Sequence, residues 1–238
     1  MVDFNSIPPR ERIIVAIDCD REEAIDIAQS LKGTATWLKV GMTLFYQEGP
    51  EIVKLFKEMG FKVFLDLKFH DIPHQIQGAA RAAALSGADM VTAHAIGGLD
   101  MMKACVTGLN SVEGENPVSL GITVLTSMNQ DDLTRGGITR SVTDQVCALA
   151  KLAKEAGLTG VVASPQEAAM LREVLGPEAY IVTPGVRPAG SSLDDQNRVA
   201  TPKEAFENGA SHLVIGRPIT GQKDRKAAFE AIVEGLNG

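Results

Sequence analysis

The sequence predicts an α/β protein that folds as a single (β/α)8 (TIM) barrel, and three observations lead to this prediction. Short runs rich in valine and isoleucine alternate eight times with segments of amphipathic helical period. The 238 residues are close to the roughly 250 that such a barrel typically has. The turn after the first predicted strand, Asp18-Cys19-Asp20, lacks the GxGxxG sequence that usually opens the alternative fold, a doubly wound open sheet.

Eight segments are predicted strands because each is short, apolar and rich in β-branched residues. In chain order they cover residues 12–18, 36–42, 62–69, 90–95, 119–126, 160–165, 180–186 and 212–218. No linker, low-complexity tract or charge run divides the chain. Residues 1–238 are therefore predicted to form one domain.

The segments between the strands carry start and stop signals of helices. Asp20 with Glu23 has the spacing of a capping box. The same spacing, with proline at the first helical position, recurs at 164–167 and 201–204. Left-handed helix ends are expected at glycines that follow helical patterns, namely Gly33, Gly60, Gly87, Gly157 and Gly209.

The composition excludes several classes of function. The chain is 45% hydrophobic and 22% charged, as globular proteins are. Its net charge is -7 and no cluster of lysine and arginine stands out, so nucleic acid is not an expected partner. Three distant cysteines without metal-ligand spacing favour a reduced, cytoplasmic location. The N-terminus has no signal-peptide core and no apolar run is long enough to span a membrane, so no membrane partner is expected.

Charged residues fall at the carboxyl ends of the first three predicted strands, where barrel enzymes build their sites. Asp18 ends the first strand, Lys39 lies late in the second, and Asp66 and Lys68 close the third. Asp71 follows in the loop, where capping the next helix is an alternative role. As an alternative to a functional site, these five charged residues could form a structural ion-pair network. Burying so many charges is costly unless function requires them, which favours a site.

Asp66 and Lys68 are two positions apart, so a regular strand directs both side chains into the mouth of the barrel. Leu65, Leu67 and Phe69 then face the helices. A lysine among carboxylates keeps its charge, because neighbouring negative charges favour the protonated form. Lys68 is therefore better suited to donating a proton than to attacking a carbonyl, which disfavours an imine-forming aldolase.

The turns after the seventh and eighth predicted strands have the composition of an anion site. Pro184, Gly185 and Arg187 follow the seventh strand, and Gly216 and Arg217 follow the eighth. These loops form the usual phosphate site of the fold. Glycine lets backbone N–H groups approach an anion, and arginine adds a charged fork. Solvated surface arginines are the alternative.

The sequence leaves the roles of segment 189–200 and of His94 undecided, and it predicts no metal site. The polar segment 189–200 is long for a loop of this kind, and it is either a mobile lid or an ordinary surface loop. His94, at the end of the fourth strand, either lines the site or packs in the core. The histidines show neither HxH nor HExxH spacing, so no metal site is predicted.

These residues together resemble the orotidine 5′-phosphate decarboxylase family, from about Arg12 to Ile219. The most specific element is DLKFHDIP at 66–73, which is similar to the Asp-x-Lys-x-x-Asp signature of that family. VAID, LKVG, VLTS, TPGVRP and IGRPI follow in the same order as in the family. The resemblance implies decarboxylation of orotidine 5′-monophosphate to UMP without metal, flavin or pyridoxal cofactor.

The resemblance also implies roles for the charged residues. Lys68 would protonate C6 of the pyrimidine, and Asp66 would lie against the carboxylate of the substrate. Asp71 would act across a homodimer interface. Asp18 and Lys39 would hold the ribose hydroxyls and complete the charged network.

Further substrate contacts follow from the same resemblance. Thr126 would meet the pyrimidine, and Gln196 would bridge base and phosphate. Pro184 and Arg187, with the Gly216–Arg217 turn, would hold the phosphate. The chain departs from the family at Gln75, because a threonine that contacts the ribose usually stands there.

Two other readings of the sequence remain. Relatives that share the signature, such as 3-keto-L-gulonate 6-phosphate decarboxylase and hexulose-phosphate synthase, use Mg²⁺ and a sugar phosphate. TPGVRP and Gln196 favour the nucleotide enzyme over these. A non-catalytic nucleotide-binding barrel is a third possibility, against which the retention of all five charged residues argues.

Overall fold

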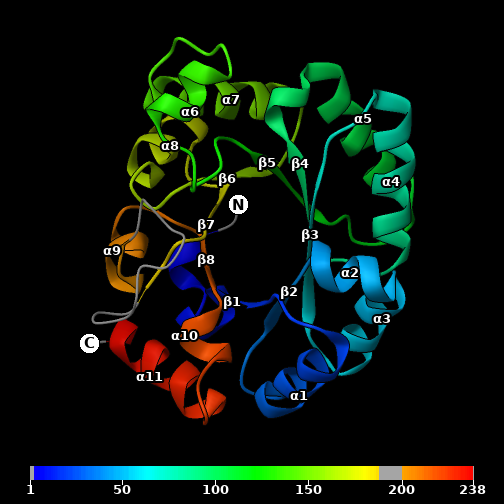
Figure 1. Ribbon diagram of the computed structural model, residues 1–238, viewed down its shortest axis with the longest axis vertical. Coiled ribbons are helices and arrows are strands. Elements are labelled where there is room, and N and C mark those ends of the chain that lie inside the picture. Colours follow the sequence, from blue (N-terminus) through cyan, green and yellow to red (C-terminus); the bar gives the residue numbers. More distant parts are fainter. Residues whose placement is uncertain (1–2, 188–199, 238) are drawn as a thin grey trace.

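The structure is a computed structural model that describes residues 3–187 and 200–237. The predicted (β/α)8 fold is confirmed, because eight parallel strands close into a barrel in chain order (Figure 1). The strands are β1 Ile13–Ile17, β2 Trp37–Gly41, β3 Lys62–Phe69, β4 Met90–His94, β5 Val118–Ile122, β6 Gly160–Val162, β7 Tyr180–Thr183 and β8 His212–Ile215.

The last four strands end three or four residues earlier than predicted. β7 ends at Thr183 because Pro184 has no N–H to continue the ladder and Gly185 has a φ of 76°. The apolar residues beyond β5, β6 and β7 therefore belong to loops at the mouth of the barrel, and Pro218 beyond β8 belongs to α10.

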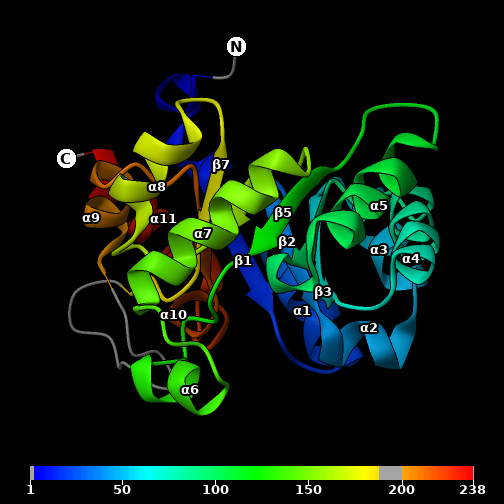
Figure 2. The same ribbon diagram turned by 90° about the horizontal axis from the view of Figure 1, so that it is seen from above.

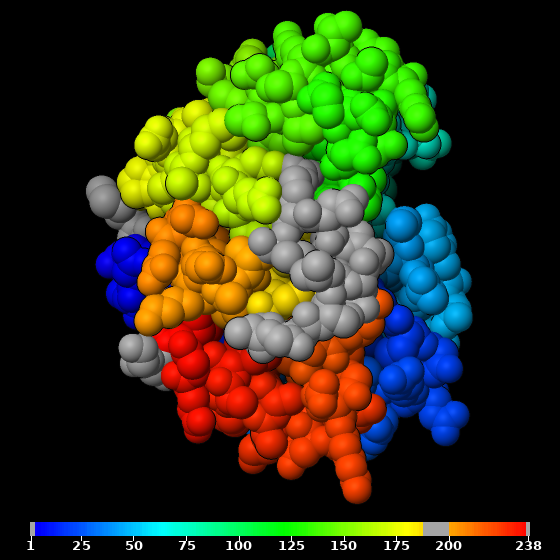
Figure 3. All heavy atoms as spheres, turned by 60° about the vertical axis from the view of Figure 1, so that its left-hand side comes forward, coloured from blue at the N-terminus to red at the C-terminus, as the bar shows by residue number. Residues whose placement is uncertain are grey.

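Helices surround the barrel, and α9 and α11 lie side by side on the face shown in Figure 3. The α-helices are α1 Arg21–Leu31, α2 Met42–Glu48, α3 Glu51–Glu58, α4 Pro73–Leu85, α5 Leu99–Asn110, α6 Gln130–Arg135, α7 Val142–Glu155, α8 Ala168–Leu175, α9 Pro202–Glu207, α10 Arg217–Thr220 and α11 Arg225–Asn237. Three short 3-10 helices are η1 Phe4–Ser6, η2 Pro9–Arg12 and η3 Ala95–Gly97. Among the described residues, no helix is long and apolar enough to cross a membrane.

Most of the predicted helix signals are confirmed. The Asp20 side chain accepts a hydrogen bond from the Glu23 N–H, and Thr201 forms a complete capping box at the start of α9. All five glycines expected to end helices have positive φ. The prediction for α8 is wrong, because this helix begins at Ala168. The Ser164 N–H donates to the Glu167 carboxylate, which closes a turn before the helix instead.

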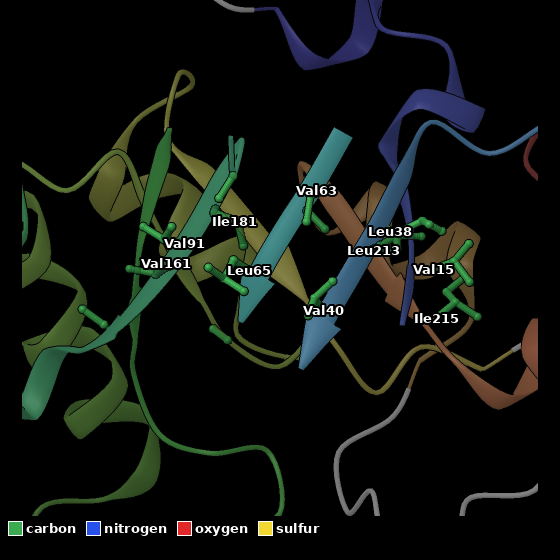
Figure 4. Packing of buried hydrophobic residues seen from close by; sticks show 14 of the residues in the cluster. Val15, Leu38, Val40, Val63, Leu65, Val91, Val161, Ile181, Leu213 and Ile215 are labelled. Atoms are coloured by element: carbon green, nitrogen blue, oxygen red, sulfur yellow. The ribbon is translucent and has the colours of Figure 1, made fainter. Parts of the chain in front are cut away.

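Strand side chains alternate between two apolar clusters. Val15, Leu38 and Val63 belong to an outer cluster between barrel and helices, and Figure 4 shows such side chains projecting from adjacent strands. Ile14 and Phe64 belong to an inner cluster that fills the barrel. The period-two alternation of strands produces these two layers.

The amino-terminal end of the barrel is closed by aromatic rings. Phe4 of η1 packs edge-on against Tyr180, with ring centroids 4.9 Å apart, and η1 lies at the opposite end of the molecule from α6 (Figure 2). The His212 ring stacks on Tyr180 at 5.4 Å. Burial, with the charges of Arg12 and Lys62, lowers the pKa of His212 to about 3. These rings thus cover the end of the barrel where β7 and β8 begin.

Candidate active site

A pocket of about 640 Å³ opens at the carboxyl ends of the strands, a volume in the range of small-molecule sites. Strand ends and loops from most of the barrel contribute to its wall. The lining residues are Ala16, Asp18, Cys19, Glu23, Ile27, Lys39, Phe64, Asp66, Lys68, Ile122, Val124, Leu125, Thr126, Val162, Pro184, Gly185, Arg187, Val214, Gly216, Arg217, Thr220 and Gly221.

Four of the charged residues predicted from the sequence form a continuous chain in this pocket. Lys39 Nζ donates to Asp18 Oδ1 at 2.8 Å and lies 3.8 Å from Asp66 Oδ2. Lys68 Nζ donates to the same Asp66 oxygen at 2.8 Å. The Asp66 and Lys39 side chains are almost fully buried, whereas the Asp18 side chain is 62% exposed. Two ammonium groups thus surround one buried carboxylate.

Asp66 is ionised in spite of its burial. Burial raises the pKa of Asp66, but the charges of Lys39 and Lys68 and the hydrogen bonds from Lys68 and Thr92 outweigh this effect and place the pKa below its ordinary value. Thr92 Oγ1 donates to Asp66 Oδ1 at 2.9 Å. The second carboxylate oxygen is therefore also hydrogen-bonded.

Lys68 reaches this position through an irregular strand. Leu65 pairs with Val91, but the next β3 residue that pairs with β4 is Phe69, opposite Ala93. Lys68 has a φ of 54°, in the left-handed region. The prediction that Lys68 faces the pocket is correct, but the regular strand on which it rested is wrong, because β3 bulges at this point.

Gly41, at the end of β2, makes room for the Asp18–Lys39 contact. A Cβ atom on this glycine would lie 2.6 Å from Asp18 Oδ1 and 3.2 Å from Lys39 Nζ. The absence of a side chain is thus a requirement of the ion pair.

Asp71 and Gln75 are exposed and are not among the described residues that line the pocket. Asp71 Oδ1 accepts a hydrogen bond from the Ile72 N–H at 2.6 Å. The alternative that Asp71 caps the next helix is wrong, because α4 has Ile72 at its N-cap and no side-chain cap bond. Within this chain, Asp71 therefore lies apart from the pocket that Asp18, Lys39, Asp66 and Lys68 line.

The two predicted anion turns lie together in the same pocket. Pro184, Gly185 and Arg187 line it after β7, and Gly216 and Arg217 line it where β8 passes into α10. Thr126, in the loop after β5, also lines the pocket. Gln196 and nearly all of the segment 189–200 lie outside the described residues.

His94 is half-buried at the end of β4, and it is not among the described pocket residues. Its ring centroid lies 5.2 Å from that of His70. Burial lowers the pKa of His94, and electrostatic interaction with His70 and Lys68 lowers it further. The charge of Asp66 acts in the opposite direction, and the net effect is a lowered pKa.

Thr92 is the residue that sequence reasoning missed. It contacts both Asp66 and Lys68, yet a threonine within an apolar strand has an ordinary strand composition. The one available signal was its place two positions before His94, on the same face of the fourth predicted strand. Among the described residues, no three His, Cys, Asp or Glu side chains gather as metal ligands would.

Known proteins are similar to this chain over nearly all of its length. The sequence matches the "Orotidine 5'-phosphate decarboxylase / HUMPS family" over residues 11–232. It is 45% identical to the orotidine 5'-phosphate decarboxylase of Carboxydothermus hydrogenoformans, over 96% of this chain and 97% of the relative. It is 48% identical to the protein of the same name from Moorella thermoacetica, over 94% and 91% of the two chains. The crystal structure of orotidine 5'-phosphate decarboxylase from Lactobacillus acidophilus superimposes with a TM-score of 0.85 at 39% identity, over 96% of this chain and 100% of the other.

Proposed function

Because this chain belongs to the orotidine 5′-phosphate decarboxylase / HUMPS family, we propose that it converts orotidine 5′-monophosphate to UMP and CO2. The observation that carries the proposal is the Lys39–Asp66–Lys68 arrangement in a pocket that also holds two Gly/Arg turns. One part of the pocket suits a reacting carboxylate, and the turns suit a phosphate.

Lys68 acts as the proton donor in this proposal. Loss of CO2 leaves a pair of electrons on C6 of the pyrimidine, and a proton from the Lys68 ammonium forms the C6–H bond of UMP. The ammonium is hydrogen-bonded to Asp66 at 2.8 Å, so its direction is set before the reaction. A positive charge aimed at the developing carbanion lowers its energy without reorganisation.

Asp66 would lie next to the substrate carboxylate, where it keeps Lys39 and Lys68 in place. Its lowered pKa supports this role, because the carboxylate stays charged at neutral pH. Asp18 and Lys39 would bind the ribose hydroxyls. The Asp18 side chain is exposed to the pocket and can accept from a hydroxyl while it also accepts from Lys39.

The phosphate would bind at Pro184, Arg187 and the Gly216–Arg217 turn. Binding energy from this non-reacting group can contribute to organising the site around the base. Thr126 would contact the pyrimidine and Gln196 would reach base and phosphate, with Gln75 in place of the usual ribose-binding threonine.

The proposed reaction needs no metal or organic cofactor. The two ammonium groups of Lys39 and Lys68 supply the positive charge at the reacting end, and they already pair with Asp18 and Asp66. The carboxylates that could otherwise bind a cation are thus neutralised by lysines.

A homodimer would bring Asp71 of one subunit to the pocket of the other. Apolar side chains are exposed within three residues of the ends of β2, β3, β4 and β5, namely Met42, Ile72, Ile96 and Leu125. They follow neighbouring strands, so they form one sector of the rim at the pocket end. An exposed apolar surface of this kind is typical of an interface, and Asp71 lies within it next to Ile72.

The direct test follows the ultraviolet absorbance of orotidine 5′-monophosphate mixed with purified protein. We expect conversion to UMP, and binding of UMP measured by calorimetry serves as the control for an intact site. A protein that binds UMP but leaves orotidine 5′-monophosphate unchanged would refute the proposal and favour a non-catalytic nucleotide-binding barrel.

A Mg²⁺-dependent sugar-phosphate enzyme of the same family is the second candidate. We expect full activity on the nucleotide after dialysis against EDTA. Loss of activity that Mg²⁺ restores would favour this second candidate instead.

A further inference from the structure

Lys68 has an unusual backbone conformation for a residue with a side chain. Among the residues that the structure describes, it is the one non-glycine position with positive φ. Left-handed backbone is unfavourable for such residues, so surrounding contacts must hold it in place. The β3–β4 ladder does not do so, because pairing stops at Leu65 and resumes at Phe69.

The Thr92 hydroxyl makes two hydrogen bonds that replace the missing ladder. It accepts from the Lys68 backbone N–H at 2.9 Å and donates to Asp66 Oδ1 at 2.9 Å. The residue is fully buried and is not among the described residues that line the pocket. The Thr92 hydroxyl therefore links the Lys68 backbone to the Asp66 carboxylate. The Lys68 ammonium contacts the same carboxylate.

We propose that Thr92 is a positioning residue, whose hydroxyl holds the bulged Lys68 backbone against Asp66 and so sets the direction of the Lys68 ammonium. The inference rests on the proposed function, in which this ammonium delivers the proton to C6. Thr92 does not touch the substrate; it acts through Lys68 and Asp66.

Thr92→Val removes the hydroxyl and keeps the shape of the side chain, whereas Thr92→Ser keeps the hydroxyl and removes a methyl group. Thr123 offers a matched control, because it is also buried and its Oγ1 donates to the Val162 backbone carbonyl at 2.9 Å. Thr123→Val thus removes a buried hydroxyl whose hydrogen bond goes to the backbone of β6 and not to the charged chain.

We expect Thr92→Val to lower kcat for orotidine 5′-monophosphate by about 10- to 100-fold, the usual effect of losing a hydrogen bond to a charged group. KM stays within about threefold, because the residue is outside the pocket wall. Thr92→Ser and Thr123→Val retain most of the parent kcat. If Thr92→Val does not fold, Thr92→Ala removes the same hydroxyl and is read in the same way.

Two results would overturn the inference. One is a Thr92→Val enzyme with the kcat of the parent. The other is an equal loss of kcat in Thr92→Ser or Thr123→Val, which would assign the effect to packing.

If the proposed function is wrong, the parent protein itself does not convert orotidine 5′-monophosphate, and this outcome is distinct from the two results above. In that case crystal structures of the parent and of Thr92→Val decide the inference. Displacement of Lys68 Nζ from Asp66 in the variant supports it, and an unchanged Lys68 overturns it.

Discussion

The Lys39 ammonium donates to Asp18 Oδ1 at 2.8 Å, which links the side chains at the ends of β1 and β2 above the barrel interior. This contact is possible because the next inward-facing position of β2 is Gly41. Lys39 also lies 3.8 Å from Asp66, so the same ammonium connects an exposed carboxylate with a buried one. Ion pairs of Lys39 thereby connect the ends of β1, β2 and β3.

Gly41→Ala is predicted to raise KM for orotidine 5′-monophosphate by about tenfold, with little change in the melting temperature. The new Cβ would displace the flexible Asp18 side chain, which is exposed and contributes little to stability. Gly235→Ala is the control, because a Cβ there meets no atom within 4 Å. An unchanged KM in Gly41→Ala would show that Asp18 does not need this position to bind substrate.

Lys68→Ala is predicted to lower kcat by about 10²- to 10⁴-fold, the contribution of a well-placed general acid, while UMP binding survives. The reason is that the phosphate and ribose contacts lie on other residues. Lys54→Ala, which removes an exposed lysine of α3 paired with Glu51, should leave both quantities unchanged. Turnover in Lys68→Ala near that of the parent would remove Lys68 from the role of proton donor.

Mixing two inactive variants tests the shared site. Lys68→Ala and Asp71→Ala are each predicted to lose nearly all activity as homodimers, but a mixed dimer has one site in which both residues are intact. Random pairing of equal amounts makes about half of the dimers mixed, so about a quarter of the parent activity should return. If no activity returns after the mixed variants are dissociated and reassociated, each site uses Asp71 and Lys68 of the same chain.

Stability is predicted to fall as the pH decreases from 6.5 towards 3, in part through His212. The ordinary pKa of histidine is 6.5 and burial lowers the pKa of His212 to about 3, so the unfolded chain takes up a proton in this window and the folded chain does not. Protonation therefore favours unfolding, by up to about 1.4 kcal/mol per pH unit.

His212→Phe should make the free energy of unfolding, measured in urea, less dependent on pH between 3 and 6.5. Measurements of the same variant at pH 7.5 give its baseline, because the imidazole is neutral there in both states. A slope equal to that of the parent would show that His212 does not contribute.

Local patterns were sufficient to predict the strands and most helix ends. Hydrophobic period and cap chemistry act over a few residues, so the eight strands and the capping box at Thr201 could be read directly. The end of β7 was predicted too late, because the apolar Val186 continues the pattern beyond Pro184 and Gly185.

The sequence by itself determined the barrel, the placement of Asp18, Lys39, Asp66 and Lys68 at its open end, and the two Gly/Arg turns. The barrel follows from the alternation of patterns along the chain, and the other two depend on residue type and spacing within one strand and its loop. Tertiary structure alone decided the bulge at Lys68, the two hydrogen bonds of Thr92 and the close approach that Gly41 permits. These features join residues of different strands, and only closure of the sheet fixes which side chains then meet.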